Sequence, residues 1–505
     1  MAKSSTAGVL LDGRTLTPAE VAAVARHGRS VELGEDARAR NAAAAAALGR
    51  LIESETPIYG VTTGVGGLRT REVSRGERPG QQLRLLRSHS CGAGRPLSPE
   101  LVRAAMVVRA NQLGVGGAGV SDELLGALVA AVNAGLVPFT RELNSLGTGD
   151  LSVLADVALA LLGEGRAWRG QEAVAAAEAL AEASLVVPSL GPRDGIAFMS
   201  SNAASIGQGA LVCDEARRLV SASLAVTSLS FRAAGADPVA FDPRVHDARA
   251  HPGQAEVAAR MRVHLDGIPA RVWKETPREV IHDPYPFRAL AQVEGATFDA
   301  LSALEAVLAV ELNSASENAL VDHATGAVLP AANFHGGSLA LALDHFRAAL
   351  AQSATLVASR VSALLDPGLM GLPAALAERP GADSGAMMLE YTAHAAAADA
   401  RLRASPVAAQ TTTVGGGIES HASFAPFAAR AAQLALESAA VAVATELVVA
   451  VRALRLRGLE GEAGTGELFA LAAERLNADM SDRALSDDVE AARALLFEEG
   501  GAAPL

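Results

Sequence analysis

A short glycine-flanked segment, Gly147–Thr148–Gly149–Asp150, places a hydroxyl and a carboxylate where the chain can turn tightly. Glycine adopts such turns at little steric cost, whereas other residues do not. Elsewhere Tyr59 stands in a glycine-rich stretch, and Arg288 follows Tyr285 in Asp-Pro-Tyr-Pro-Phe-Arg. A phenol acts as a base only where its neighbours stabilise the phenolate, and a guanidinium pairs with a carboxylate through two hydrogen bonds. Together, these residue types could move a proton beside a bound carboxylate.

Seven segments between about residues 55 and 425 resemble the histidine and phenylalanine ammonia-lyase family, and they occur in that family's order. They are Tyr59–Gly66, Leu86–Gly94, Asp283–Arg288, Glu311–Asn318, Asn333–Gly336, Ser384–Gly385 and Glu419–His421. One short match would be weak evidence, but the shared order is specific. The resemblance implies a mainly α fold: a long-helix bundle with a mixed α/β N-terminal part.

In that family an Ala-Ser-Gly run cyclises and loses two waters, which gives the electrophile 4-methylideneimidazol-5-one. The corresponding run here is Gly147–Thr148–Gly149. Dehydration of Thr148 would leave an ethylidene, whose extra methyl group crowds the carbon that an amine must attack. Another alignment selects Ser145, but Leu146 follows it, where ring closure favours glycine. The sequence therefore argues against the standard autocatalytic group and indicates no added cofactor.

The resemblance also assigns roles to individual residues. Tyr59 matches the base that removes the β-proton, and Tyr285 matches a hydrogen-bonding partner at the cofactor. Arg288 matches the clamp on the substrate carboxylate, and Glu419 matches a glutamate near the substrate amine. The alternatives are a packing role for the tyrosines and ordinary ion pairs for Arg288 and Glu419.

Three further residues are candidates for substrate binding. His89 matches the position that reads the substrate side chain, and it could otherwise be a structural histidine. Phe334 matches a residue packed beside the cofactor, and Asn202 stands two places after the family's asparagine. Several family residues near the electrophile are replaced, by Val153, Asp156, Ser200, His282 and Ile418. The changes surround the amine-capturing group, whereas the residues for proton transfer and carboxylate binding remain.

Composition limits the alternatives. The chain has 505 residues, a formal charge of −13 and no long basic block, so nucleic acid is not an expected partner. Two cysteines give no disulfide framework, and the scattered histidines show no metal-ligand spacing. The apolar run Ala439–Val451 is too short to cross a bilayer and predicts a core helix. The N-terminus lacks the apolar stretch of a signal peptide, so we expect a cytoplasmic protein without membrane contacts.

The sequence predicts three regions: an N-terminal domain over residues 1–195, a long-helix bundle over 196–480 and a helical tail over 481–505. Long helices are expected over Ala296–Asn313, Ser338–Leu365, Ser384–Arg403 and Ala425–Arg457. Thr17 and Ser98 are predicted N-caps, each followed by proline. A short hairpin is expected around Asp12–Gly13.

The resemblance implies a homotetramer with shared active sites and a small amino-acid-like substrate. Three functions stay open. The first is a lyase or aminomutase with an altered electrophile at Thr148. The second is an enzyme without that group, in which Tyr59 catalyses elimination, addition or cyclisation. The third is a non-catalytic paralogue that binds a ligand or another subunit.

Overall fold

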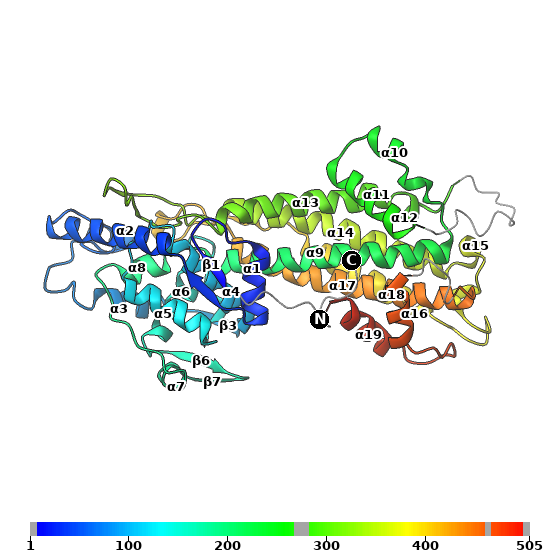
Figure 1. Cartoon of the computed structure of the whole chain (residues 1–505), viewed down its shortest axis with the longest axis horizontal. Helices are drawn as coiled ribbons and strands as arrows, with labels where there is room; N and C mark the ends of the chain where they lie inside the picture. Colours follow the sequence, from blue (N-terminus) through cyan, green and yellow to red (C-terminus); the bar gives the residue numbers. More distant parts are fainter. Residues whose placement is uncertain (1–7, 267–281, 460–465, 498–505) are drawn as a thin grey trace. The chain divides into compact units, whose positions relative to one another are not determined.

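The computed structural model describes residues 8–266, 282–459 and 466–497, and this part of the chain is mainly helical (Figure 1). Its contacts divide the chain into two compact units. Unit 1 comprises Met1–Asp214, Leu304–Leu343 and Pro406–Arg430; unit 2 comprises Glu215–Ala303, Asp344–Ser405 and Ala431–Leu505. The expected mainly α fold is confirmed.

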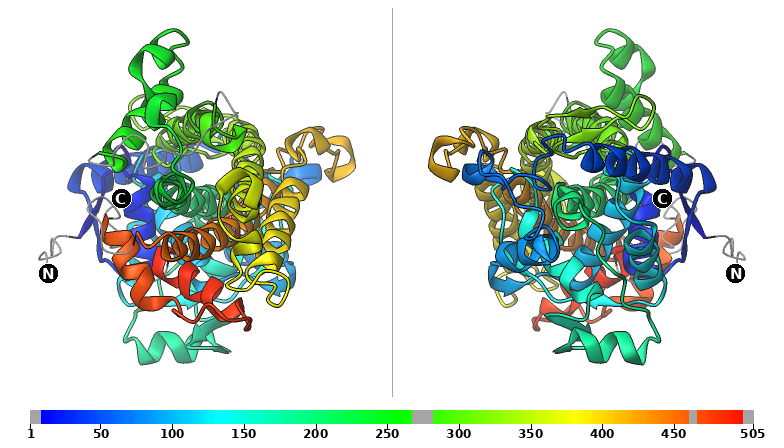
Figure 2. Two further views of the ribbon diagram at one scale, coloured as in Figure 1. Left: turned by 90° about the vertical axis from the view of Figure 1, so that its right-hand side faces the viewer. Right: turned by 90° about the vertical axis from the view of Figure 1, so that its left-hand side faces the viewer.

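The four longest helices each have residues in both units. They are α9 (Ala203–Ala234), α13 (Leu290–Glu311), α14 (Gly337–Leu365) and α17 (Ala425–Leu456). Three of them correspond to predicted helices, and the fourth prediction corresponds to α16 (Met387–Arg403). In unit 2 the long helices are seen end-on, packed side by side, in the left view of Figure 2. Two of them, α14 and α17, are long and apolar enough to cross a membrane, but 72% of each apolar window is buried, as in core helices.

The remaining helices of unit 1 are shorter. They are α1 (Pro18–His27), α2 (Glu35–Glu53), η1 (Gly66–Leu68), α3 (Gln81–His89), α4 (Pro99–Leu113), α5 (Asp122–Asn133), α6 (Leu151–Leu161), α7 (Ala176–Glu182), α8 (Asp194–Met199), η4 (Ala408–Gln410) and η5 (Gly415–Gly417). Both predicted caps are confirmed: Thr17 forms a capping box with Glu20, and Ser98 accepts the Leu101 N–H.

Short strands complete unit 1. They are β1 (Val9–Leu11), β2 (Val31–Leu33), β3 (Ala93–Pro96), β4 (Val137–Pro138), β5 (Arg141–Leu143), β6 (Arg166–Arg169), β7 (Glu172–Ala175), β8 (Leu320–Val321) and β9 (Val328–Leu329). The predicted hairpin around Asp12–Gly13 is wrong, because β1 pairs in parallel with β2. The Asp12 carboxylate accepts the N–H groups of Arg14 and Thr15, and Gly13 donates to Asn111. These bonds turn the chain toward α1 instead of folding it back.

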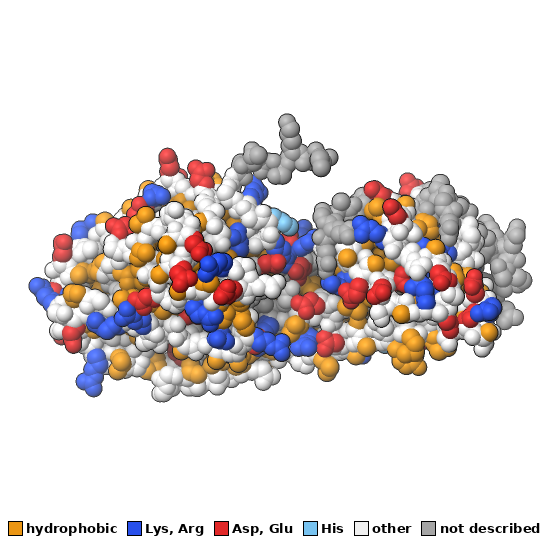
Figure 3. Space-filling model, turned by 90° about the horizontal axis from the view of Figure 1, so that it is seen from below, with side chains coloured by type: hydrophobic (Ala, Val, Ile, Leu, Met, Phe, Trp, Pro, Cys, Tyr) orange, Lys and Arg blue, Asp and Glu red, His pale blue; other side chains and the backbone are white. Residues whose placement is uncertain are grey.

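Unit 2 adds short helices around the long ones. They are η2 (Pro238–Phe241), α10 (Pro243–Asp247), α11 (Pro252–His264), α12 (Tyr285–Arg288), α15 (Pro367–Met370), η3 (Ala374–Leu376), α18 (Gly466–Arg475) and α19 (Ser486–Phe497). Buried Phe287 anchors α12, since its ring lies 5.4 Å from Phe231, which in turn packs against Phe241. On the face shown in Figure 3, acidic and basic side chains intermingle.

Candidate active site

Two serine hydroxyls form hydrogen bonds with the backbone of the segment around Thr148. Ser145 Oγ accepts the Gly147 N–H and donates to the Gly149 carbonyl, each at 2.9 Å. The buried Ser423 Oγ donates to the Gly147 carbonyl at 2.8 Å, across 276 residues of sequence. Both hydroxyls are therefore engaged with the backbone of the segment.

Gly147 cannot carry a side chain in this arrangement. Its φ is +88°, and an added Cβ would lie 2.1 Å from Ser423 Oγ and 2.9 Å from the Phe424 nitrogen. The alanine that the related family has at this position would therefore collide with Ser423.

We expect Gly147→Ala to lower the free energy of unfolding by about 2–5 kcal/mol, because left-handed strain adds to overpacking. Chemical denaturation measures the loss. The double variant Gly147→Ala/Ser423→Gly removes the contact with Ser423 Oγ but not the one with the Phe424 nitrogen, so it should recover part of the loss from overpacking. Equal stability of the single and double variants would contradict the collision.

Four helices begin in or beside this segment. Helix α6 starts directly after Asp150, and α9 begins where Ser205 donates its N–H to the Asp150 carboxylate at 2.7 Å. Helix α17 begins beside Ser423, whose Oγ accepts the Ala425 N–H at 3.3 Å. Helix α14 begins at Gly337, next to the bridge between Thr148 and His335. Helix N-termini carry partial positive charge, so the segment lies in a field that favours anions.

Asp150 is the buried carboxylate of this segment. Burial raises the pKa of its carboxyl to about 6, although hydrogen bonds from the Ser205 N–H and Oγ favour the charged form. The folded protein therefore holds a proton on Asp150 between pH 3.8 and about 6, where the unfolded chain has released it.

This difference stabilises the fold below pH 3.8 and is lost as the pH rises through about 6. We expect Asp150→Asn to remove this part of the pH dependence, on the order of 3 kcal/mol between pH 4 and 7. Thermal unfolding of both proteins across that range tests it, and parallel stability curves would contradict the assignment.

Tyr59 is fixed by the backbone of its own loop. Its hydroxyl oxygen accepts the Gly66 N–H at 2.9 Å, which fixes the position of the oxygen. Gln82 ties the loop to α8, since its amide donates to the Gly60 carbonyl at 2.9 Å and accepts the Ile196 N–H at 3.1 Å.

The loop of Glu419 lies against the loop of Tyr59. A Cβ on Gly67 would lie 3.6 Å from Ile418 Cδ1, which is ordinary van der Waals contact. The Val414 N–H donates to the Glu419 carbonyl at 2.9 Å and closes a tight turn over η5. Unit 1 thus brings the Glu419 loop and the Tyr59 loop together.

Asn202, Phe334 and Thr148 also lie close together. The Asn202 amide donates to the Phe334 carbonyl, while its Oδ1 is buried without a hydrogen-bond partner among the described residues. His335, the residue after Phe334, bridges to Thr148. His89 is half-buried, and its Nδ1 lies 2.8 Å from the Leu85 carbonyl of its own helix, so Nε2 is the nitrogen left for a ligand.

Tyr285 and Arg288 belong to unit 2, on α12. The Arg288 guanidinium carbon lies 5.0 Å from the centre of the Tyr285 ring, a cation–π distance. Both side chains are exposed, and Tyr285 is 62% exposed. Each could therefore reach a ligand or a second copy of the chain.

Two of the replaced family positions now serve internal contacts. The half-buried Asp156 carboxylate accepts the Ser90 hydroxyl at 2.5 Å and the Thr140 hydroxyl at 2.7 Å, and partial burial raises its pKa. Ser200 Oγ accepts the Asn318 N–H at 3.3 Å.

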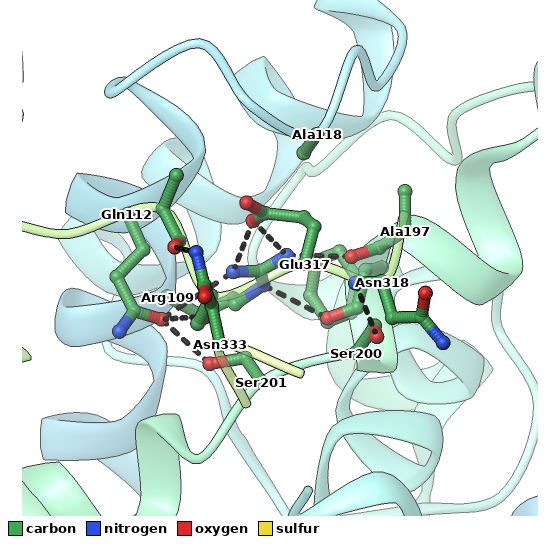
Figure 4. Close-up of polar contacts among 12 residues, drawn as sticks. Arg109, Gln112, Ala118, Ala197, Ser200, Ser201, Glu317, Asn318 and Asn333 are labelled. Carbon is green, nitrogen blue, oxygen red and sulfur yellow. Dashed lines mark hydrogen bonds and ion pairs between the residues drawn. The ribbon is translucent and has the colours of Figure 1, made fainter. Parts of the chain in front are cut away.

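A buried ion pair between Arg109 and Glu317, which no local sequence pattern indicates, supports the site. Figure 4 shows its contacts. Arg109 and Glu317 are fully buried, with Nη2 and Oε1 3.1 Å apart. Arg109 also donates to the carbonyls of Ala197 and Phe198, at 2.5 and 2.9 Å. The Ser201 carbonyl then accepts the Asp150 N–H at 2.6 Å, so the pair positions the segment that carries Thr148.

A pocket of about 40 Å³ lies beside Asp150, lined by Asn144, Gln208 and the ion pair of Glu142 with Arg430. It has room for about three waters, far less than an amino acid needs.

Known proteins resemble this chain in sequence and in structure. Residues 16–475 match the sequence model of the family described as aromatic amino acid lyase. A histidine ammonia-lyase of Treponema denticola is 34% identical over 484 residues, which is 95% of each chain. The ergothioneine-degrading enzyme ergothionase of Treponema denticola has a similar structure (TM-score 0.91, 27% identity, 97% of this chain and 98% of that one). So does a tyrosine aminomutase of Streptomyces globisporus (TM-score 0.92, 29% identity, 97% of each chain).

Proposed function

The chain belongs to the aromatic amino acid lyase family and is an ammonia-lyase-type enzyme, and on that premise we propose that it eliminates an amine by tyrosine acid–base chemistry without the standard methylidene group. The substrate is a small amino acid or a related carboxylate. The observation that carries the proposal is Tyr59, whose oxygen is fixed by the Gly66 N–H in the loop beside Glu419.

The residues present do not fit the methylidene group of the family. A methylidene needs a serine at the centre of the tripeptide, and Thr148 stands there. The hydroxyl of the nearby Ser145 accepts the Gly147 N–H and donates to the Gly149 carbonyl. The Gly147 carbonyl, which ring closure would remove, is the acceptor of the buried Ser423 hydroxyl. Loss of that acceptor would leave a buried donor unsatisfied.

If no electrophile captures the substrate amine, the charge state of the substrate nitrogen decides whether it can leave. The nitrogen has to leave from its positively charged ammonium form, because only that form departs as a neutral molecule. Tyr59 takes the proton from carbon, and the Glu419 carboxylate holds the ammonium until it leaves. A carboxylate next to the cation is favourable on Coulombic grounds.

The remaining candidates bind the rest of the substrate. Arg288 clamps the carboxylate through its planar fork, and Tyr285 donates a hydrogen bond beside it. His89, through Nε2, and Phe334 contact the side chain, and the unpartnered Asn202 Oδ1 accepts a hydrogen bond. We propose a homotetramer in the cytoplasm in which the exposed Tyr285 and Arg288 of one copy complete the site of another.

A substrate panel tests the proposal. Purified enzyme is incubated with histidine, tyrosine, phenylalanine and ergothioneine, and the amine and the unsaturated carboxylate are quantified together. Equal release of both products from at least one compound supports elimination. A β-amino acid formed without net amine release would indicate an aminomutase, and no turnover of any carboxylate would contradict the proposal.

A further inference from the structure

Two histidines that the proposed elimination does not use lie in contact beside Thr148. His335 Nε2 and His421 Nδ1 are 2.9 Å apart, with ring centres at 5.0 Å. His335 bridges to Thr148, and His421 comes two residues before Ser423, which bonds to Gly147. The pair therefore lies beside the segment that carries Thr148.

The hydrogen bonds determine which nitrogen of each ring carries the proton. His335 Nδ1 accepts the Gly337 N–H at 3.2 Å, so the proton of the neutral ring is on Nε2. That proton points to His421 Nδ1, which accepts it. The proton of His421 is consequently on Nε2, and the exposed edge of the ring is a donor.

The surroundings of His335 disfavour its protonation. Burial, followed by the neighbouring His421, lowers the pKa of His335. A proton on His335 Nδ1 would also face the Gly337 N–H at the start of α14, where the helix end disfavours a cation. His335 is thus held neutral, and the hydrogen bonds assign a single tautomer to the pair.

We propose that His421 is a substrate-binding residue whose Nε2–H donates to an anionic oxygen of the substrate, and that His335 is the positioning residue that fixes its tautomer. The inference rests on the proposed function, which requires a carboxylate-bearing substrate. A neutral donor suits that substrate, because a histidinium would repel the ammonium that has to leave. The helix N-termini that meet at this segment also favour an anion there.

Binding of unsaturated carboxylates tests the inference without turnover. The probes are trans-cinnamate, urocanate and 4-coumarate, the elimination products of phenylalanine, histidine and tyrosine, and calorimetry gives their Kd. We expect His421→Leu to weaken the best probe about 10- to 100-fold, as loss of a hydrogen bond to a charged group does. His421→Gln keeps an N–H donor and should stay within about threefold.

His335→Asn keeps an acceptor for the Gly337 N–H but gives His421 no donor, so it should weaken the probe about threefold to tenfold. His323→Leu, at an exposed histidine of unit 1, is the control and should bind normally. Circular dichroism and the melting temperature establish that each variant is folded. If His421→Leu binds within twofold of wild type, or as tightly as His421→Gln, the inference is overturned. Wild-type protein that binds a probe but turns over no amino acid contradicts the proposed function alone, and failure to bind any probe contradicts both.

Discussion

Tyr59→Phe is expected to lower kcat by about 10²–10⁴-fold, the range typical for loss of a positioned acid–base group. The variant keeps the ring and its packing and loses only the oxygen that accepts the Gly66 N–H. Steady-state kinetics on the best substrate of the panel measures the effect. KM should change much less than kcat, because the phenol is assigned to proton transfer.

Tyr391→Phe is the matched control for this variant. Tyr391 lies on α16 in unit 2, is 64% exposed and has no assigned role, so its kcat should equal that of wild type. A Tyr59→Phe enzyme with a kcat within threefold of wild type would show that another group takes the proton.

Glu317→Ala is expected to lower the free energy of unfolding by about 3–5 kcal/mol, the cost of stranding a buried charge. It removes the carboxylate from the fully buried Arg109, and Arg193, whose pKa burial lowers to about 10, also loses a nearby anion. Urea denaturation measures the loss. Turnover should fall as well, since Arg109 holds the carbonyls that precede the Ser201–Asp150 contact.

An exposed ion pair provides the comparison. Arg169 and Glu178 lie 3.4 Å apart with both side chains largely exposed, so Glu178→Ala should leave stability almost unchanged. If Glu317→Ala were as stable as Glu178→Ala, the buried pair would not support the site.

The sequence predicts the long helices because their information is local. Apolar periodicity and the near absence of proline and glycine mark α13, α14, α16 and α17, and the caps Thr17 and Ser98 lie next to the helices that they start. The Asp12–Gly13 hairpin fails for the converse reason, since its turn is held by Asn111, far away in the sequence.

The supporting contacts of the candidate site could not be predicted, because they join distant segments. Ser423 and Gly147 are 276 residues apart, and Arg109 and Glu317 are 208 residues apart. No pattern within one segment indicates such a pair. The resemblance located Tyr59, Glu419 and the Thr148–Asp150 run but passed over Ser423 and the tautomer of His421, which depend on packing. The roles of the site residues and the three predicted regions stay predictions.

Elimination without the methylidene group is tested most directly by the intact mass of the purified chain, with peptide mapping across Arg141–Arg166. We expect the mass of the unmodified sequence, with Ser145 and Thr148 recovered intact in an enzyme that turns over its substrate. A loss of two waters located at Gly147–Thr148–Gly149, or at Ser145, would show that an electrophile forms and would contradict elimination without amine capture.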